Sequence, residues 1–161
     1  MLDMEKIKTD IVQPLAISVV EILKIQCSYL VEHKPPISGS ENLTSKTDIA
    51  AVIALSGSDV NGCIALCLPE KVFLALMGGM FGEKPTTINA EIQDGAGELL
   101  NIIFGTAKNV WNERGHAVEK AIPTIAIGRD LKLRHLTPIP TIILPFMSPD
   151  GEFHMELAIN Q

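Results

Sequence analysis

The segment Asp94-Gly-Ala-Gly-Glu98-Leu-Leu-Asn101-Ile-Ile-Phe-Gly105 predicts the helix around which the fold is built. Apolar residues recur at the spacing of a buried helical stripe, at Ile92, Ala96, Leu99, Ile103, Ala107 and Val110. A second row has the same spacing two residues out of phase: Asp94, Glu98, Asn101, Gly105, Lys108 and Asn112. At about 100° per residue, that offset places the second row on the opposite, solvent-facing side. Glu98 and Asn101 therefore lie side by side, and no other glutamate in the chain has an asparagine three residues later.

Length and composition predict one soluble domain over residues 1–161, large enough to bury a core. Apolar residues make up 47% of the chain and the mean hydropathy is +0.27, which argues against disorder and leaves apolar surface for self-association. The net charge of −6 argues against nucleic-acid binding, and the one basic cluster, 129–135, is interpreted as a solvated loop. Without a membrane-length apolar run or a signal-peptide pattern, we expect a cytoplasmic protein that does not bind membranes.

The cysteines and histidines predict no metal site or cofactor. The three cysteines, Cys27, Cys63 and Cys67, form no CxxC pair, and their odd number fits reduced, unpaired thiols. Cys63 and Cys67 are expected on one face of a strand, as small apolar residues. The four histidines are far apart in the sequence and form no HExxH motif. No zinc site is proposed from this pattern, although residues distant in sequence could still meet in space.

Turn-forming residues divide the rest of the chain into about three helices and about six strands. The helices are expected at Ile11–Lys24, with a start anywhere from Met4 to Gln13, at Pro69–Met80, and from a cap at Asn89 to Glu113. The strands are expected at 25–32, 49–55, 62–68, twice within 118–128, at 141–146 and at 152–159. Residues 33–48 are expected to form a long loop. Because hairpin-like pairs follow one another, the predicted class is α+β with a mostly antiparallel sheet.

Glu98 and Asn101 are poor nucleophiles, and their chemistry points to the handling of water. A neutral asparagine amide has one acceptor and two donor hydrogens, so it can hold a water molecule. A glutamate can act as a base or pair with a cation. Together they suit assisted hydrolysis of an already activated phosphoryl group. The chain has no P-loop, GxSxG or Cys/His motif with which to activate a substrate by itself.

Asn101 and three glycines, Gly95, Gly97 and Gly105, weaken this helix. Asparagine competes for backbone hydrogen bonds, and each glycine costs roughly 1 kcal/mol relative to alanine. One explanation is that the glycines form a flat exposed ridge on which the backbone of a partner can lie closely. The other is that they let the helix pack tightly within its own fold. The residues alone do not decide between the two.

The chain resembles the CheC/CheX/FliY phosphatases of bacterial chemotaxis, and among these it is most similar to CheX. The resemblance rests on the motif Asp94-x-x-x-Glu98-x-x-Asn101, with the later Gly105 and Pro123. The order of elements also matches: a lead helix, a hairpin ending Gly62-Cys-Ile-Ala-Leu66, a Pro69-Glu70 helix, the motif helix and Pro123-Thr-Ile-Ala-Ile-Gly128. The similarity covers residues 11–159, which implies a CheC-like fold for nearly the whole chain.

The resemblance implies dephosphorylation of the aspartyl phosphate on a CheY-like response regulator. Asn101 would enter the regulator's active site and align the attacking water, and Glu98 would pair with the regulator's lysine. Asp94, Gly105 and Lys108 would contact the same partner. The regulator would carry the Mg²⁺, and this chain would bind no cofactor or metal.

The resemblance also implies one site in each chain and a homodimer. Related proteins carry two such helices, but here the lead helix has Glu21-Ile-Leu-Lys24, with lysine where asparagine is needed. The homodimer would form by pairing of edge strands, which accounts for the apolar surplus.

Two other functions fit parts of the sequence. The first is a non-catalytic module that binds regulators, as in the related flagellar switch proteins, but such a scaffold has no need of a water-positioning amide. The second is a structural or sensory domain in which the loop 33–48 is the variable part. Turnover of a phosphorylated receiver domain distinguishes all three.

Overall fold

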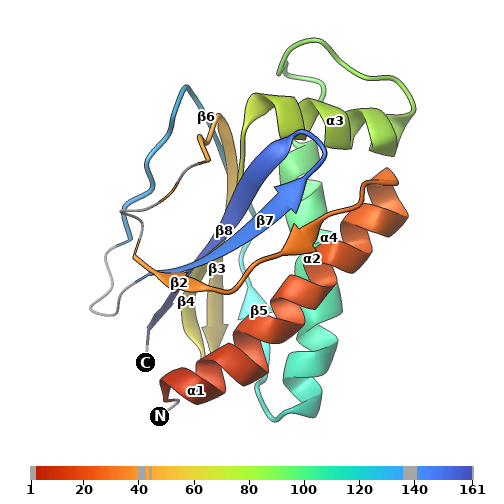
Figure 1. Cartoon of the computed structure of the whole chain (residues 1–161). Helices are drawn as coiled ribbons and strands as arrows, with labels where there is room; N and C mark the ends of the chain where they lie inside the picture. Colours follow the sequence, from red (N-terminus) through yellow and green to blue (C-terminus); the bar gives the residue numbers. More distant parts are fainter. Residues whose placement is uncertain (1–2, 40–42, 44, 136–140, 161) are drawn as a thin grey trace.

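The computed structural model describes residues 3–39, 43, 45–135 and 141–160, which form one antiparallel sheet covered by helices on one face (Figure 1). The helical segments are α1 (Met4–Lys6), the π-helical η1 (Ile7–Val12), α2 (Gln13–Cys27), α3 (Glu70–Phe81) and α4 (Gly95–Glu113). The strands are β1 (Glu32–His33), β2 (Ile37–Ser38), β3 (Ile49–Gly57), β4 (Asn61–Leu68), β5 (Val118–Lys120), β6 (Thr124–Ile127), β7 (Ile142–Ser148) and β8 (Gly151–Asn160).

The sheet has the order β1-β7-β8-β4-β3-β5, with β2 also paired to β7 and β6 to β3. The predicted α+β class and antiparallel sheet are therefore confirmed, with eight strands instead of about six. The hairpin 49–68 is confirmed, and its register joins Ile49 to Leu68 and Leu55 to Gly62. The final hairpin is confirmed as β7 and β8. The two additional short strands, β1 and β2, both pair with β7.

The lead helix begins at Met4, the earliest start that was expected, because α1, η1 and α2 follow one another without a break, and it ends at Cys27 instead of Lys24. Pro14 lies in the first turn of α2, directly after the π-helical segment. Because the helix is continuous, Pro14 interrupts its hydrogen-bond ladder, and the wider π-helical turn before it accommodates the ring and the missing donor.

The strand predicted at 25–32 is wrong. Helix α2 continues to Cys27 and ends at Ser28, which has a left-handed φ of 50°. Tyr29 and Val31 are buried and Leu30 is exposed, so the alternation that suggested a strand is real. Ladder pairing, however, begins only at Glu32. Within the predicted loop 33–48, Ile37–Ser38 is a strand, and residues 40–42 and 44 lie outside the described part.

Helix α3 runs past its two internal glycines and ends at Gly82, which has a φ of +83°. Gly79 marks close packing, because a Cβ built there would collide with the backbone oxygen of Cys27. The cap predicted for the motif helix belongs to a preceding turn. The Asn89 Oδ1 accepts from the backbone N–H groups of Glu91 (2.9 Å) and Ile92 (3.2 Å), and α4 itself begins at Gly95.

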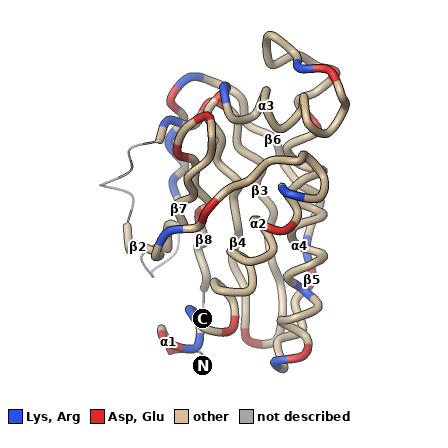
Figure 2. Tube along the Cα trace, turned by 45° about the vertical axis from the view of Figure 1, so that its right-hand side comes forward, with Lys and Arg blue, Asp and Glu red and all other residues tan. Residues whose placement is uncertain are grey.

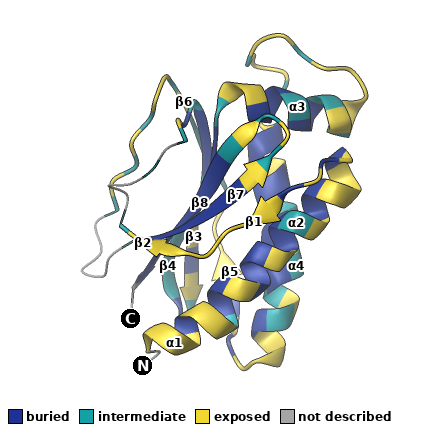
Figure 3. Ribbon diagram, viewed as in Figure 1, coloured by how far each residue is buried: buried dark blue, intermediate teal, exposed yellow. Residues whose placement is uncertain are grey.

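The core lies between α2, α4 and one face of the sheet, here called the core face (Figure 3). Alternate strand residues point toward it, including Ile53, Ile64, Leu66, Met155 and Leu157. The opposite face, here called the outer face, carries a separate small cluster of Ala50, Ala65 and Cys67, against which Val52 and Leu133 pack. Cys63 and Cys67 lie on this outer face of β4, as predicted from their alternation with Ile64 and Leu66.

The C-terminal end of α4 is anchored to the lead helix. The Trp111 Nε1 donates to the backbone oxygen of Ile11 (3.2 Å), and the Arg114 guanidinium donates to that of Thr9 (2.6 Å). His116, just beyond α4, lies between Asp10 (2.9 Å) and Asp59 (2.8 Å). Burial disfavours the imidazolium, but the hydrogen bonds with the two carboxylates outweigh it and raise the pKa of His116. These contacts fix the orientation of α4 on the sheet.

None of the described helices combines the length and the apolar character that crossing a bilayer requires. Charged residues of both signs are spread along the trace (Figure 2). In the predicted basic loop 129–135, the side chains of Arg129, Lys132 and Arg134 are exposed, whereas Leu131, Leu133 and His135 are partly buried. The segment is therefore amphipathic, with its cations toward solvent.

Candidate functional site

The predicted polar row lies along the outward side of α4, and none of its six residues is buried. Asp94, Glu98, Gly105 and Asn112 are exposed, and Asn101 and Lys108 are partly buried. The opposite side of the helix is buried more broadly than the predicted stripe, since it also includes Leu100, Phe104 and Trp111. Because that apolar side is held against α2 and the sheet, the row has a rigid support.

Asn101 is less exposed than its place in the row predicted. Its Oδ1 is buried and has no hydrogen-bond partner among the described residues. An unpaired buried acceptor costs about 1–3 kcal/mol. Such a group is rare in folded proteins, and its persistence calls for an explanation. The residue as a whole is only partly buried, so a rotation of the amide would bring this oxygen to the surface, where a group from outside the chain can donate to it.

Glu98 projects from the neighbouring position of the row and is exposed. Its backbone N–H donates to the Asp94 carbonyl oxygen (3.0 Å) in the first turn of α4. Within the described part of the chain, its carboxylate makes no ion pair. The carboxylate is therefore available to a cation on a partner.

The three glycines of α4 were explained in two ways, as an exposed ridge for a partner or as sites of tight packing within the fold, and the structure assigns them to different explanations. Gly95 and Gly97 are buried, so tight packing within the fold explains them and the exposed ridge does not. A Cβ on Gly95 would collide with the Met77 sulfur, and one on Gly97 would come within 3.2 Å of Ile125 and 3.3 Å of Pro123. Gly105 is exposed, and a Cβ built there meets no atom within 4 Å. Only Gly105 belongs to the open surface of the row.

The contact between Pro123 and Gly97 brings the connection from β5 to β6 onto the N-terminal half of α4. Ile122, the residue before Pro123, is 87% exposed and is the most exposed of the large apolar side chains described. An apolar side chain thus lies near the polar row.

Lys108, predicted to contact a partner, has an ion pair within the chain. Its Nζ donates to the Glu119 Oε1 on β5 at 2.8 Å. Glu119 is largely exposed, so the pair is solvated and weak. A protein that docks over this end of the row could share Lys108 or displace its partner.

A second polar cluster, which the sequence did not predict, lies on the outer face of the sheet. It joins Cys63, Cys67, His135, His154 and Glu156 through side-chain contacts. Burial opposes the Glu156 carboxylate, but hydrogen bonds with His135 and His154 lower its pKa to about 2. Hydrogen bonds with Cys63 and Glu156 raise the pKa of His135 to about 10, against the effect of burial. In the sequence, the only sign of this cluster is an even spacing, which puts residues on one face of a strand: four residues from Cys63 to Cys67, and two from His154 to Glu156.

Comparison with known proteins identifies a family for the chain. The family model described as chemotaxis phosphatase CheX matches residues 49–147, which is more than half of the chain and includes all of α4. No curated protein matches the chain significantly.

Solved structures share the fold over nearly the whole chain. A CheC-like superfamily protein from Shewanella sp. PV-4 is 29% identical, with a TM-score of 0.88, and the match covers 95% of this chain and 99% of that one. The chemotaxis protein CheX from Vibrio vulnificus is 28% identical, with a TM-score of 0.86 and coverage of 92% and 98%. CheX in a CheX–CheY–BeF₃–Mg²⁺ complex from Borrelia burgdorferi is 20% identical, with a TM-score of 0.72 and coverage of 94% and 99%, and at this identity the likeness concerns the fold.

The order of elements, the polar row on α4 and the family match over residues 49–147 agree with one another. The chain belongs to the CheX family of chemotaxis phosphatases.

Proposed function

We propose that this protein hydrolyses the aspartyl phosphate of a CheY-like receiver domain, with Asn101 and Glu98 as its working residues. The observation that carries the proposal is the unpaired Oδ1 of Asn101, held beside an exposed carboxylate on a rigid helix. The Borrelia CheX was solved together with CheY, BeF₃ and Mg²⁺, which supports a receiver as the partner. Such a substrate would place the activity in the cytoplasm.

The reaction needs a water molecule in line with the phosphorus–oxygen bond that breaks. The water oxygen attacks phosphorus, the bond to the receiver's aspartate breaks, and the products are aspartate and inorganic phosphate. The Mg²⁺ would be bound by the receiver, where it offsets the charge on the phosphoryl oxygens. This chain would supply the positioning.

Asn101 suits that role because its amide has no internal hydrogen bond to its oxygen. Because Oδ1 is buried in the free chain, the amide must rotate before an attacking water can donate to this oxygen, and the rotation breaks no hydrogen bond between the oxygen and the described residues. The backbone of α4 is already fixed by its apolar side, so little order is lost when the water is bound. In the complex this oxygen would accept from the attacking water.

Glu98 would hold the receiver in place. Its exposed, unpaired carboxylate can form an ion pair with a lysine of the receiver, one helical turn from Asn101. Asp94, Gly105 and Lys108 extend the same row and would lie under the docked receiver, with Ile122 as an apolar contact at its edge. The row would therefore both bind the receiver, through Glu98 and its neighbours, and position the water, through Asn101.

We also propose that two copies of the chain form a homodimer through an edge of the sheet. Strand β6 pairs only with β3 among the described strands, and its Ile127 is 46% exposed. A second copy could continue the ladder and cover this side chain. Sedimentation velocity should give the mass of two chains for the wild type and of one for Ile127→Glu. A monomeric wild type would contradict the dimer without affecting the proposed hydrolysis.

The first prediction on activity concerns Asn101→Ala. This variant should lower receiver dephosphorylation on the order of 100-fold, because the water loses its positioning group. Its fold should be intact, since the substitution removes an unpaired polar atom instead of a satisfied one. Phosphate release from a panel of phosphorylated receivers, at catalytic amounts of enzyme, measures the effect.

The matched control is Asn109→Ala, which removes an exposed asparagine of the same helix about two turns beyond Asn101. It should retain wild-type turnover. If Asn101→Ala stays within a few fold of the wild type, Asn101 does not position the water. If the wild type binds phosphorylated receivers without accelerating phosphate release, the chain is a binding module.

The second prediction separates docking from chemistry. Glu98→Ala should raise KM about tenfold, equivalent to ~1.4 kcal/mol, with kcat nearly unchanged, because the lost ion pair acts on binding. Glu98→Lys should raise KM further through repulsion of the receiver's lysine. The control, Glu113→Lys, makes the same charge change at the far end of α4, beyond the range of screened electrostatics. A loss confined to kcat would instead assign Glu98 to the chemical step.

The third prediction tests whether the receiver passes over Gly105. Gly105→Ala should raise the free energy of unfolding by about 1 kcal/mol, because the added methyl meets no other atom. Gly105→Leu should fold but lose dephosphorylation by obstructing the receiver. Glu113→Leu places the same side chain at the far end of α4, away from the row, and should remain active. Thermal melts measure the stability of each variant, and turnover measurements give its activity. A stable, fully active Gly105→Leu would show that the receiver does not dock over Gly105.

A further inference from the structure

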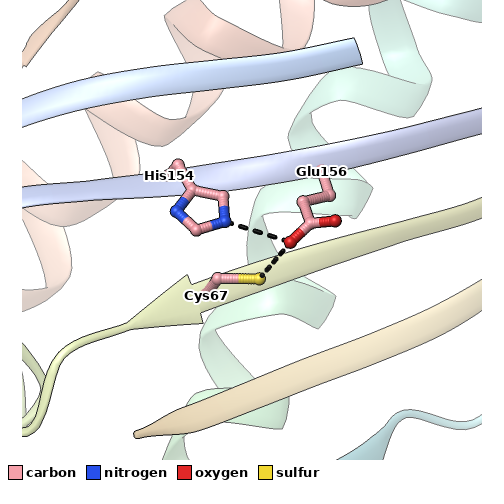
Figure 4. A group of neighbouring side chains, drawn as sticks. All are labelled: Cys67, His154 and Glu156. Carbon is pink, nitrogen blue, oxygen red and sulfur yellow. Dashed lines mark hydrogen bonds and ion pairs between the residues drawn. The ribbon is translucent and has the colours of Figure 1, made fainter. Parts of the chain in front are cut away.

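Three polar side chains meet on the outer face of the sheet, on the side opposite α4. Cys67 lies on β4, and His154 and Glu156 lie on the neighbouring strand β8 (Figure 4). The register pairs Cys67 directly with His154, and Glu156 is two residues further along the same face. All three residues are almost completely buried, with exposed fractions of 0%, 1% and 4%.

The three side chains present one sulfur, one nitrogen and one oxygen to a common point. The Glu156 Oε2 is 3.0 Å from the His154 Nε2 and 3.5 Å from the Cys67 Sγ, and the three atoms all lie within 4.8 Å of one another. Tetrahedral Zn²⁺ with bonds of about 2.0–2.3 Å separates neighbouring ligand atoms by about 3.3–3.5 Å. Small side-chain shifts would therefore suffice to admit an ion.

The His154 and Glu156 side chains are each held by a hydrogen bond to the polar atom that would not bind the ion. The His154 Nδ1 is hydrogen-bonded to the Ser45 hydroxyl (2.8 Å), which leaves Nε2 directed at the common point. The Glu156 Oε1 is held by the His135 Nε2 (3.0 Å), and the other ring nitrogen of His135 contacts the Cys63 sulfur (3.2 Å). Contacts of this kind orient the ligands in protein metal sites.

A cavity of about 120 Å³ adjoins two of the three side chains, those of His154 and Glu156. Its other lining residues are Leu43, Ser45, Thr47, Leu131, Lys132 and Leu133. One water occupies about 30 Å³ of liquid, so the cavity has room for a water on a fourth coordination position. The donor set, one thiol, one imidazole and one carboxylate, suits Zn²⁺ better than the all-oxygen preference of Mg²⁺ or Ca²⁺.

We propose that Cys67, His154 and Glu156 bind one Zn²⁺ ion, with a water from the cavity as the fourth ligand. On binding, the Cys67 thiol releases its proton to solvent, and the sulfur becomes a thiolate ligand. One thiolate and one carboxylate then balance the double positive charge, so the buried complex carries no net charge. The ion would act as a structural clamp that holds the segment 131–135, through His135 and Leu133, on the outer face.

The test is metal binding by the intact chain. The wild type, dialysed against Zn²⁺ and then against metal-free buffer, should retain one zinc per chain by plasma mass spectrometry. The Co²⁺-loaded chain should show the intense visible bands of tetrahedral cobalt and a thiolate-to-cobalt charge-transfer band. Zinc should also raise the Tm, because it binds the folded state.

Variants identify the ligands. Cys67→Ser should abolish the charge-transfer band and weaken zinc binding at least 100-fold, and His154→Gln should also weaken it at least 100-fold. Cys27→Ser, a change at a buried thiol in α2, should bind like the wild type. Cys63→Ser should weaken zinc by about 10–100-fold at most, because Cys63 acts only through His135. Circular dichroism confirms that each variant is folded.

Wild-type protein that retains no zinc, or whose cobalt complex lacks the thiolate band, overturns the proposal whatever the variants do. A folded Cys67→Ser with wild-type affinity overturns it as well. Loss of the thiolate band in Cys63→Ser together with its retention in Cys67→Ser would assign the ion to other ligands and reject this set. None of these results depends on dephosphorylation, because the outer face is separate from the row on α4.

Discussion

The packing of α4 against the core face is the interaction on which the rest of the structure depends. Its buried side, with Leu99, Ile103 and Ala107, fills the space between α2 and the sheet, and Trp111 ties its end to the lead helix. Once that side is fixed, the helical period dictates which residues face outward. The position of Glu98 and Asn101 is therefore a consequence of core packing, and the candidate site needs no loop to assemble it.

Much of the fold followed from periodicity, because the elements that bury a regular stripe carry it in their sequence. The motif helix, the hairpin of β3 and β4 and the final hairpin all have such patterns. The strand expected at 25–32 failed for a physical reason: alternation reports burial, and Tyr29 and Val31 are buried without ladder partners. The start of the lead helix could be placed only between Met4 and Gln13, because a π-helical segment changes the period just before Pro14.

The candidate site was predictable in outline and not in detail. The row on α4 needs only the period of one helix, whereas the burial of the Asn101 oxygen depends on its tertiary surroundings. The same limit applies to Gly95 and Gly97, whose neighbours Met77 and Pro123 come from distant parts of the chain. The cluster on the outer face is an extreme case, because strand register alone places Cys67 against His154.

The central claim is that Asn101 enters the active site of a receiver and holds the attacking water there. A structure of this chain bound to a receiver carrying beryllium trifluoride and Mg²⁺ tests it most directly. The account predicts that the row from Asp94 to Lys108 lies against the receiver, with the Asn101 amide within hydrogen-bond distance of a water beside the beryllium. A complex in which α4 faces solvent, or in which Asn101 makes no contact near the beryllium, would contradict it.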